Sequence, residues 1–425
     1  MVECPTCFVS FPVEDIVEHA DMCAAWYVES DDGIPASGHA IVLDGNYSSD
    51  SNDTELGDTE GPTFVSLIRQ LQNNLEPGDP VRINVRRKTL WEDFLGQRRK
   101  RVKPQSKLKV VFLGEPAIDD GGPRREFFSD MLEIVERKYF TNGSPVDSVA
   151  ALSANAFRTV GEIMVMSILQ GGPAPNFLSP ATYTYVSRKP LNPNDNTNEL
   201  NKAIANKLNL ANSDEEVRAI LTEDSGLDAL DSIGYRGVPQ RETVLSVKEI
   251  IRSICIKDQF STILPQLIQL EEGLSSCGLL ESIHRFPDSW KPIFMQSDRF
   301  KMTADQFLEE AAVEYSTSQM LKDLELNTYK VFCDVMQSIY EEGLSGMQME
   351  NFVKWLTGSK YTPPLGFTRK FAVKFVHGCD EGCKCRPTVS TCDVVLKLPV
   401  HIKSFEEMSL MVESAVKDSS GFGMI

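Results

Sequence analysis

The spacing of cysteine and histidine in residues 1–26 constrains the fold more than any other feature of this sequence. Two residues separate Cys4 from Cys7, and three residues separate His19 from Cys23. This spacing offers two thiolates on a tight knuckle, and a third thiolate with an imidazole one helical turn apart. A unit this short has few core positions, so a tetrahedral zinc ion would supply most of its stability. We predict a small zinc-stabilised ββα finger, against the alternative that the four residues are unrelated.

The charge of the chain favours proteins as partners. Its formal net charge is -18 at pH 7. Nucleic acids and anionic membranes bind basic surfaces, so this charge disfavours both. The predicted helix of the finger, residues 14–23, contains four acidic residues and neither lysine nor arginine. We therefore expect no nucleic acid and no membrane among its partners.

Several residues of the finger match a known module. They are Cys4-Pro-Thr-Cys7, Phe11-Pro12, Ile16 and His19-Ala20-Asp21-Met22-Cys23. The segment is similar to the ubiquitin-binding zinc fingers of DNA-damage-response proteins. In that family the aspartate two positions before the last ligand contacts ubiquitin, and Asp21 occupies that position. The resemblance implies that Ala20 and Asp21 bind ubiquitin.

Residues 27–62 differ from the rest of the chain in composition. They are rich in aspartate, serine, glycine and asparagine and contain few apolar residues. Such a segment cannot bury enough apolar surface to offset the entropy of ordering it, so we predict an acidic, disordered linker. The 41% hydrophobic content of the 425 residues allows two to four folding units in all.

Helical and strand patterns mix along the remaining residues. Phe64–Leu71, Phe307–Tyr315 and Tyr329–Tyr340 show helical spacing, whereas Leu108–Leu113 is typical of a buried strand. Residues 393–398 and 399–402 look extended. With no regular repeat, these patterns predict an α+β fold.

The ends and the apolar stretches of the sequence predict a soluble intracellular protein. No apolar leader follows Met1, and stretches such as Ile163–Leu169 are too short to span a bilayer. In a reducing compartment the ten cysteines should be thiols, metal ligands or nucleophiles. The basic groups Arg86–Lys88 and Arg98–Arg101 read as a nuclear address or as one face of a helix, and interleaved apolar residues favour the helix. We expect a cytoplasmic or nuclear location.

Cys392 stands at a polar approach to an apolar strand. A partner could reach a thiolate there, although a buried structural cysteine is the commoner reading of this spacing alone. The surrounding motifs are more specific. In chain order they are Phe352–Ser359, Pro364–Phe367, Ser390-Thr391-Cys392, Leu396–Pro399 and Gly421-Phe422-Gly423. Together they resemble the catalytic lobe of HECT ubiquitin ligases, which we place at residues 321–425.

Segments further upstream are similar to the start of the first HECT lobe, which we place at residues 63–320. They are Arg82–Arg86, Trp91–Asp93, Val111–Glu115, Asp119–Phe128 and Phe157–Gly161. Gly121-Gly122-Pro123 predicts a turn, and Arg125-Glu126-Phe127-Phe128 predicts the start of a helix whose aromatic side chains pack a core. We assign these residues structural roles. The order of finger and shortened HECT region resembles the divergent group typified by the G2/M-phase-specific ubiquitin ligase.

The HECT resemblance implies a covalent mechanism. Proteins of this family accept ubiquitin from a conjugating enzyme as a thioester and pass it to a substrate lysine. Cys392 would be the acceptor, and Thr391 would hydrogen-bond the developing charge. Phe422 would help to fix the arrangement of the lobes. The transfer itself needs no cofactor, so zinc in the finger is the one metal expected.

The sequence also departs from the family. Ser390 replaces a histidine that is frequent two positions before the nucleophile, and Asp393-Val394 replaces a frequent Phe-Asn. A carboxylate beside a thiol opposes ionisation of the thiol, so charging with ubiquitin could be slow or absent. The first lobe is also short. These departures keep open a second interpretation, a non-catalytic ubiquitin-binding adaptor with a degenerate HECT domain.

A second group of cysteines precedes the nucleophile. Cys379, Cys383 and Cys385 follow His377 closely enough to bind zinc, with Cys392 as a further ligand. The interpretation that we prefer is a cysteine-rich surface loop between two strands.

Overall fold

The computed structural model describes residues 61–115, 121–344, 346–379 and 383–418, together with the backbone of two short strands near the start of the chain. These strands, β1 (Val2–Glu3) and β2 (Ser10–Phe11), pair antiparallel. The zinc ligands and ubiquitin-binding residues predicted for the finger, residues 27–60 of the predicted linker, and Phe422 lie outside the described residues. The chain divides into Met1–Asp58 and Thr59–Ile425, and each unit is considered by itself.

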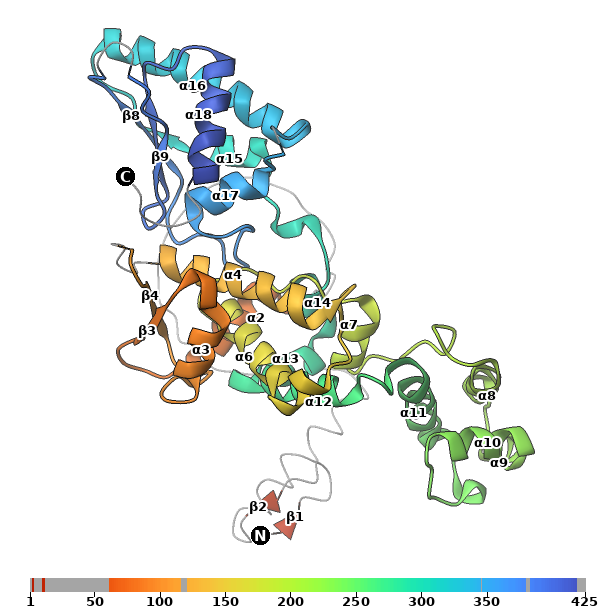
Figure 1. The fold of residues 1–425 in the computed structure, drawn as a ribbon. Helices are drawn as coiled ribbons and strands as arrows, with labels where there is room; N and C mark the ends of the chain where they lie inside the picture. Colours follow the sequence, from red (N-terminus) through yellow and green to blue (C-terminus); the bar gives the residue numbers. More distant parts are fainter. Residues whose placement is uncertain are drawn as a thin grey trace, which may run out of the picture. The chain divides into compact units, whose positions relative to one another are not determined.

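Two hydrophobic cores organise the larger unit (Figure 1). Buried residues from Phe64 to Phe300 form the first core, and buried residues from Met302 to Ala415 form the second. We call the corresponding regions the first lobe and the second lobe. The expectation of a mixed α+β fold is confirmed. By packing, the second lobe begins near Met302, so the boundary expected after residue 320 falls inside it.

The first lobe is mostly helical. Its helices are α2 (Phe64–Leu71), α3 (Leu90–Arg98), α4 (Gly122–Tyr139), α5 (Val149–Ser153), α6 (Ala156–Leu169), α7 (Pro180–Val186), α8 (Glu199–Leu210), α9 (Asp214–Thr222), α10 (Asp224–Ser232), α11 (Val247–Phe260), α12 (Leu264–Leu274), α13 (Leu279–Arg285) and α14 (Pro287–Phe294). Its strands form two pairs, β3 (Val81–Val85) with β4 (Leu108–Phe112) in parallel and β5 (Phe140–Thr141) with β6 (Ser144–Pro145) antiparallel. No helix in the described residues is both long and apolar enough to cross a bilayer.

Local sequence explains the elements that lead to the site. Thr63 caps α2, and the apolar residues of its predicted periodicity are all buried. Strand β4 confirms the extended stretch expected from residue 108. Helix α4 begins where a turn was expected: Gly121 has a φ of 106°, which favours glycine, and Pro123 suits the first helical turn. Phe127 and Phe128 are fully buried, as the predicted core-packing role requires.

Two glycines allow α6 and α12 to cross with their backbones in contact. Helix α6 is buried on nearly every face, as expected for a helix that is apolar all round. A Cβ atom added to Gly161 would lie 2.6 Å from the Leu270 carbonyl oxygen. A Cβ atom added to Gly273 would lie 2.1 Å from the Arg158 carbonyl oxygen. The first core therefore has no room for a methyl group at this crossing.

We expect Gly161→Ala to lower the free energy of unfolding by about 2–3 kcal/mol, because the helices must separate to accept the methyl group. Gly96 in α3 is the matched control, since nothing lies within 4 Å of its added Cβ atom. Gly96→Ala should stabilise the chain by up to about 1 kcal/mol through helix propensity. Urea unfolding of both variants measures the difference, and equal midpoints would contradict this crossing geometry.

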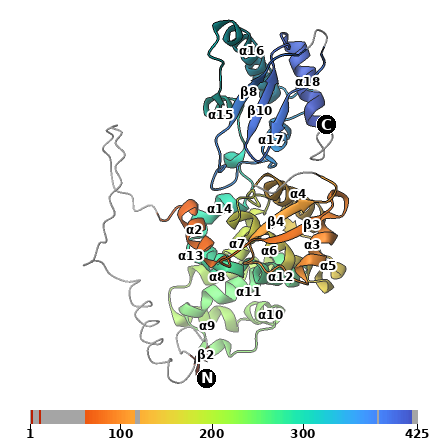
Figure 2. The same cartoon turned by 90° about the vertical axis from the view of Figure 1, so that its left-hand side faces the viewer.

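The second lobe packs helices with one mixed sheet (Figure 2). The sheet order is β7-β8-β10-β9, formed by β7 (Ala312–Val313), β8 (Ala372–Val376), β10 (Val395–Pro399) and β9 (Thr388–Ser390). Strand β10 is parallel to β8 and antiparallel to β9. The helices are α15 (Ala304–Glu310), α16 (Gln319–Glu341), α17 (Met349–Thr357) and α18 (Phe405–Asp418). Short 3-10 helices η1 (Gln72–Asn74), η2 (Arg87–Thr89), η3 (Pro239–Arg241), η4 (Val244–Ser246), η5 (Ser276–Gly278) and η6 (Asp298–Phe300) belong to the first lobe.

One predicted helix of the second lobe is wrong in its second half. The helical spacing expected through Tyr315 ends with α15 at Glu310, and Ala312–Val313 form β7 instead. The Ala312 amide donates to the Phe371 carbonyl oxygen (2.8 Å) beside β8. Pairing with a strand that is distant in sequence therefore overrides the local helical pattern. The helix expected at residues 329–340 is confirmed as part of α16.

Candidate functional site

Cys392 lies in the turn of a β-hairpin. Residues 391–394, which we call the nucleophile turn after the role predicted for Cys392, connect β9 to β10, and Ser390 is paired with Val395 at the start of the ladder. The Cys392 side chain is partly exposed. Leu396, the second residue of β10, is fully buried and anchors the strand in the second core. The turn therefore presents a thiol to solvent on a rigid support.

Val394 gives the nucleophile turn an unusual backbone. Its φ is 56°, in the left-handed region that β-branched residues rarely adopt. Its side chain is fully buried. Such a conformation costs about 1–3 kcal/mol and persists where the surrounding structure determines it. Burial of the valine side chain thus holds the turn in one shape, two residues beyond Cys392.

The amino end of α4 is in contact with the nucleophile turn. A Cβ atom added to Gly122 would lie 2.7 Å from Thr391 Oγ1 and 3.2 Å from both the amide nitrogen and Sγ of Cys392. Glycine is therefore the residue that lets the first lobe approach the second here. The amino end of a helix also carries partial positive charge, which lies beside the thiol in this arrangement.

Arg125 joins the same helix to the second lobe. Its guanidinium donates hydrogen bonds to the carbonyl oxygens of Thr391 (2.6 Å) and Thr357 (2.9 Å), the last residue of α17. The side chain is buried, with 5% of the residue exposed. Sequence reasoning placed Arg125 in a structural helix start and missed this contact with the nucleophile turn. One signal was present, because a cation in the first turn of a helix opposes the helix dipole and needs acceptors elsewhere.

Further contacts fix α4 against the end of α17. Lys354 Nζ lies 2.6 Å from Asp130 Oδ1 and 3.5 Å from Glu133 Oε2. Gly358 follows α17 with a φ of 81°, and its added Cβ atom would lie 2.9 Å from the Gly122 carbonyl oxygen. Residues 122–133 of α4 thus contact α17 and the nucleophile turn together.

Thr391 has a buried hydroxyl group next to the nucleophile. The residue is 5% exposed, and its Oγ1 atom has no hydrogen-bond partner among the residues that the structure describes. A buried polar atom without a partner costs roughly 1–3 kcal/mol, so such atoms in native proteins often serve a function. Thr391 is the neighbour of Cys392 in the chain. This position agrees with the expected role of its hydroxyl group, a hydrogen bond to the charge that develops during transfer.

Asp393 has a counter-charge close to it. Its carboxylate forms an ion pair with Arg369 and accepts a hydrogen bond from Ser390 Oγ (3.0 Å). From the sequence, this carboxylate is expected to oppose ionisation of the Cys392 thiol. The guanidinium offsets that negative charge at the turn. Ser390, the other departure from the family pattern, is part of the same arrangement.

A buried carboxyl group lies in the second turn of α4. Arg87 donates to Glu126 Oε1 (2.7 Å), while Oε2 is buried with no hydrogen-bond partner in the described ranges. Burial raises the pKa of Glu126 from 4.5 to about 7, against the opposing effect of the Arg87 cation. The group is therefore partly protonated near neutral pH.

The raised pKa predicts a pH-dependent stability. An unfolded glutamate loses its proton near pH 4.5, whereas folded Glu126 keeps its proton to about 7. The folded state binds more protons between these values, so this group's contribution to the free energy of unfolding falls as pH rises through that window. The loss amounts to at most about 3 kcal/mol. Glu126→Gln does not titrate, so its stability relative to the natural chain should rise between pH 5 and pH 8 in urea unfolding. A difference independent of pH would contradict the raised pKa.

Gly122→Ala tests the contact between α4 and the nucleophile turn. The added methyl group should displace the turn, so amide hydrogen exchange in residues 391–394 should accelerate at least about tenfold as local opening becomes easier. The overall unfolding midpoint should fall less than in Gly161→Ala, because the methyl group meets a hairpin turn here and not the backbone of a second core helix. Gly96→Ala again serves as control. Unchanged exchange in Gly122→Ala would mean that the two lobes do not meet here in solution.

A second cluster of potential metal ligands lies apart from the nucleophile. The ligand atoms of Cys379, Cys385 and His401 all lie within 4.8 Å of one another. Cys392 is not in this group, which corrects the interpretation in which it completes a zinc site with the upstream cysteines. His377 instead has Nε2 2.6 Å from Glu325 Oε1. Sequence spacing gave no sign that His401 would join the cysteines.

Known proteins match most of this chain. The model of the HECT-domain (ubiquitin-transferase) family matches residues 123–425. The G2/M phase-specific E3 ubiquitin-protein ligase of Gallus gallus is 20% identical over 323 residues, covering 73% of this chain and 42% of that protein. The protein of the same name from Homo sapiens is 22% identical over 345 residues, covering 77% of this chain and 46% of its own length. E3 ubiquitin-protein ligase UPL2 of Arabidopsis thaliana is 23% identical over 404 residues, covering 86% of this chain but 10% of its own. The chain thus spans less than half the length of these relatives.

Proposed function

Since this chain belongs to the HECT-domain (ubiquitin-transferase) family, we propose that it is a ubiquitin ligase that carries ubiquitin as a thioester on Cys392. The observation that carries the proposal is the partly exposed thiol at a hairpin turn in contact with the amino end of α4. The partners are ubiquitin, a conjugating enzyme and a protein substrate. No cofactor takes part in the transfer.

The reaction proceeds in two exchanges at sulfur. The Cys392 thiolate attacks the thioester carbonyl of the charged conjugating enzyme, a new carbon–sulfur bond forms, and the enzyme's thiolate leaves. A substrate lysine, as a free amine, then attacks the carbonyl on Cys392. The isopeptide bond forms, the Cys392 thiolate leaves, and the proton of the amine passes to solvent or to a neighbouring base.

The neighbours of Cys392 have separate tasks in this scheme. The Thr391 hydroxyl donates to the oxyanion that develops at the carbonyl, which would satisfy its buried Oγ1 atom. Arg125 is a positioning residue, since it acts through the Thr391 carbonyl oxygen. Phe422 is proposed to stabilise the lobe arrangement, as in the family. The partial positive charge of the α4 amino end favours an anionic sulfur.

The conjugating enzyme would dock on the later part of the first lobe, the usual docking region in the family. Helices α8 to α11 pack together in this part of the lobe (Figure 1). Leu210 is 77% exposed and Leu245 is 90% exposed in this region. Exposed large apolar side chains of this kind fit a protein partner.

The amino-terminal finger would capture ubiquitin near the catalytic lobe. Cys4, Cys7, His19 and Cys23 are proposed to hold a structural zinc ion, with ubiquitin bound through Ala20 and Asp21. The antiparallel pairing of β1 with β2 suits the two strands of a ββα finger. A tether would raise the local concentration of ubiquitin at Cys392. The proposed location is the cytoplasm or the nucleus, where thiols are kept reduced.

Formation of the thioester tests the proposal directly. Incubation with activating enzyme, a panel of conjugating enzymes, ATP and ubiquitin should give an adduct that dithiothreitol removes on a non-reducing gel. Cys392→Ala should abolish it, whereas Cys392→Ser should give an oxyester that resists dithiothreitol. Cys333→Ser is the matched control, since Cys333 is also a partly exposed thiol in the second lobe.

Absence of the adduct with every conjugating enzyme would overturn the ligase proposal. The second candidate function, a ubiquitin-binding adaptor, would then apply if the chain still binds ubiquitin. Asp393, which follows Cys392 directly, favours this candidate, because a carboxylate beside a thiol opposes its ionisation. Ubiquitin binding that Asp21→Ala abolishes, together with no adduct, is the result expected of an adaptor.

A further inference from the structure

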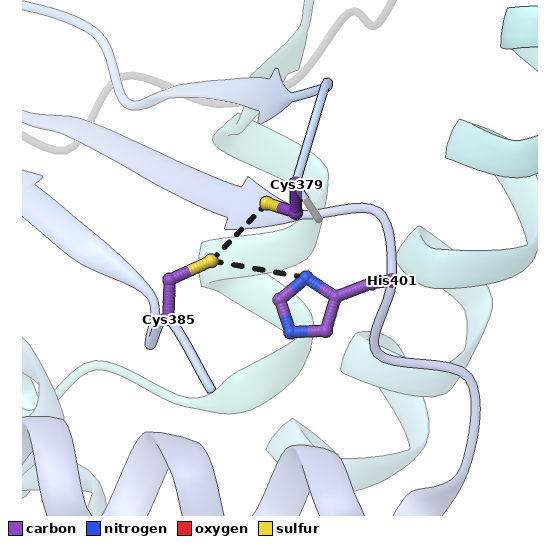
Figure 3. Close-up of side chains that lie close together, drawn as sticks. All are labelled: Cys379, Cys385 and His401. Atoms are coloured by element: carbon purple, nitrogen blue, oxygen red, sulfur yellow. Dashed lines mark hydrogen bonds between the residues drawn. The ribbon is translucent and has the colours of Figure 1, made fainter. Parts of the chain in front are cut away.

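Three side chains of the second lobe converge on one point away from Cys392 (Figure 3). The sulfur atoms of Cys379 and Cys385 lie 3.2 Å apart, and Cys385 Sγ lies 3.8 Å from His401 Nδ1. A fourth potential ligand is adjacent, because Cys383 Sγ accepts a hydrogen bond from the Cys385 amide (3.4 Å). Two thiols and an imidazole therefore lie close enough together to share one ion, and the thiol of Cys383 lies beside them on the same loop.

The distances suit a tetrahedral metal ion better than the free side chains. Metal–sulfur bonds of about 2.3 Å and metal–nitrogen bonds of about 2.0 Å place two sulfur atoms roughly 3.8 Å apart, and a sulfur and a nitrogen roughly 3.5 Å apart, in a tetrahedron. The distance between Cys385 and His401 is a few tenths of an ångström longer than this, and the two sulfur atoms need to move apart by roughly half an ångström. Thiols themselves are weak hydrogen-bond partners, so their clustering brings little stability without an ion.

The surroundings of the His401 imidazole and of the Cys383 sulfur also fit a metal site. His401 Nε2 is buried with no hydrogen-bond partner in the described part of the chain, so Nδ1 is the nitrogen with polar neighbours. The amide that donates to Cys383 Sγ favours an anionic sulfur there, as second contacts of ligands do in metal sites. Thiolate and imidazole ligands together select zinc among the common divalent ions.

We propose that Cys379, Cys383, Cys385 and His401 bind a structural zinc ion, separate from the zinc expected in the amino-terminal finger. The thiols would release their protons to solvent as the ion binds. No redox step takes part. The proposal stands without the proposed transfer activity, because it concerns residues that do not touch Cys392.

The position of the site in the hairpin gives the ion a task. Cys385 lies shortly before β9, and His401 lies shortly after β10. Cys392 lies at the closed end of the same hairpin, between the two strands. An ion bound by Cys385 and His401 would therefore fasten the open end, and Cys379 would tie in the segment that follows β8. Zinc here would keep β9 and β10 in register beneath the nucleophile turn.

Metal content of the full chain tests the site. A background of Cys4→Ser with Cys7→Ser removes the expected finger site, and elemental analysis after dialysis should still find about one zinc per chain. Adding Cys385→Ser or His401→Ala to this background should remove that zinc. Adding Cys333→Ser, which lies outside the cluster, should leave it bound. Cobalt in place of zinc should show the intense visible bands of a tetrahedral thiolate site.

A conservative variant guards against simple misfolding. His401→Cys offers a fourth thiolate and should retain the zinc that His401→Ala loses. A cooperatively unfolding background chain that holds no zinc would overturn the proposal. A disulfide between Cys379 and Cys385, found by peptide mass spectrometry of freshly purified chain without reductant, would overturn it as well. None of these measurements uses ubiquitin, so their outcome is independent of the transfer activity.

Discussion

The contact on which the candidate site depends is the pair of hydrogen bonds from Arg125 to carbonyl oxygens of the second lobe. Burial of a guanidinium lowers the stability of the folded state unless its N–H groups are hydrogen-bonded. Loss of either carbonyl acceptor would therefore leave a buried charged group with an unsatisfied donor. One acceptor belongs to the residue before Cys392 and the other ends α17. Arg125, together with the close approach of Gly122, therefore positions both the nucleophile turn and α17 relative to α4.

Helix α4 can do this because its first and second turns obey different constraints. Phe127 and Phe128 anchor it in the first core, where aromatic burial fixes the helix as a rigid body. Its first residue, Gly122, has no side chain, so the backbone reaches Cys392 directly. A larger residue at that position would separate the lobes, whereas a smaller one at Phe127 would loosen the helix. Helix α4 thus couples the position of the first core to the position of the Cys392 sulfur atom in the second lobe.

The sequence predicts elements whose cause is local and misses contacts whose cause is tertiary. Helix α2 follows from the periodicity of its own apolar residues, and the apolar strand expected after Cys392 follows from its own composition. Strand β7 has two residues and exists through pairing with β8, which no local pattern encodes. The bond from Arg125 to Thr391 joins residues 266 positions apart, so it could not be read from spacing. His401 could not be assigned to the cysteine cluster from spacing either, because the path of β10 brings it next to Cys385.

The bonds around Cys392 also differ in strength according to whether they lie within the hairpin or between the lobes. Within the hairpin, buried Val394 and Leu396 anchor the turn, and Arg369 with Asp393 adds a local ion pair. Between the lobes, apart from Arg125, the described contacts include ion pairs such as Lys354 with Asp130, whose side chains are 28% and 21% exposed. Partly solvated ion pairs contribute little and exchange readily with water. The proposed transfer presents one thiol first to a donor and then to a lysine, and a turn of fixed shape joined to the first lobe by weaker contacts suits both steps.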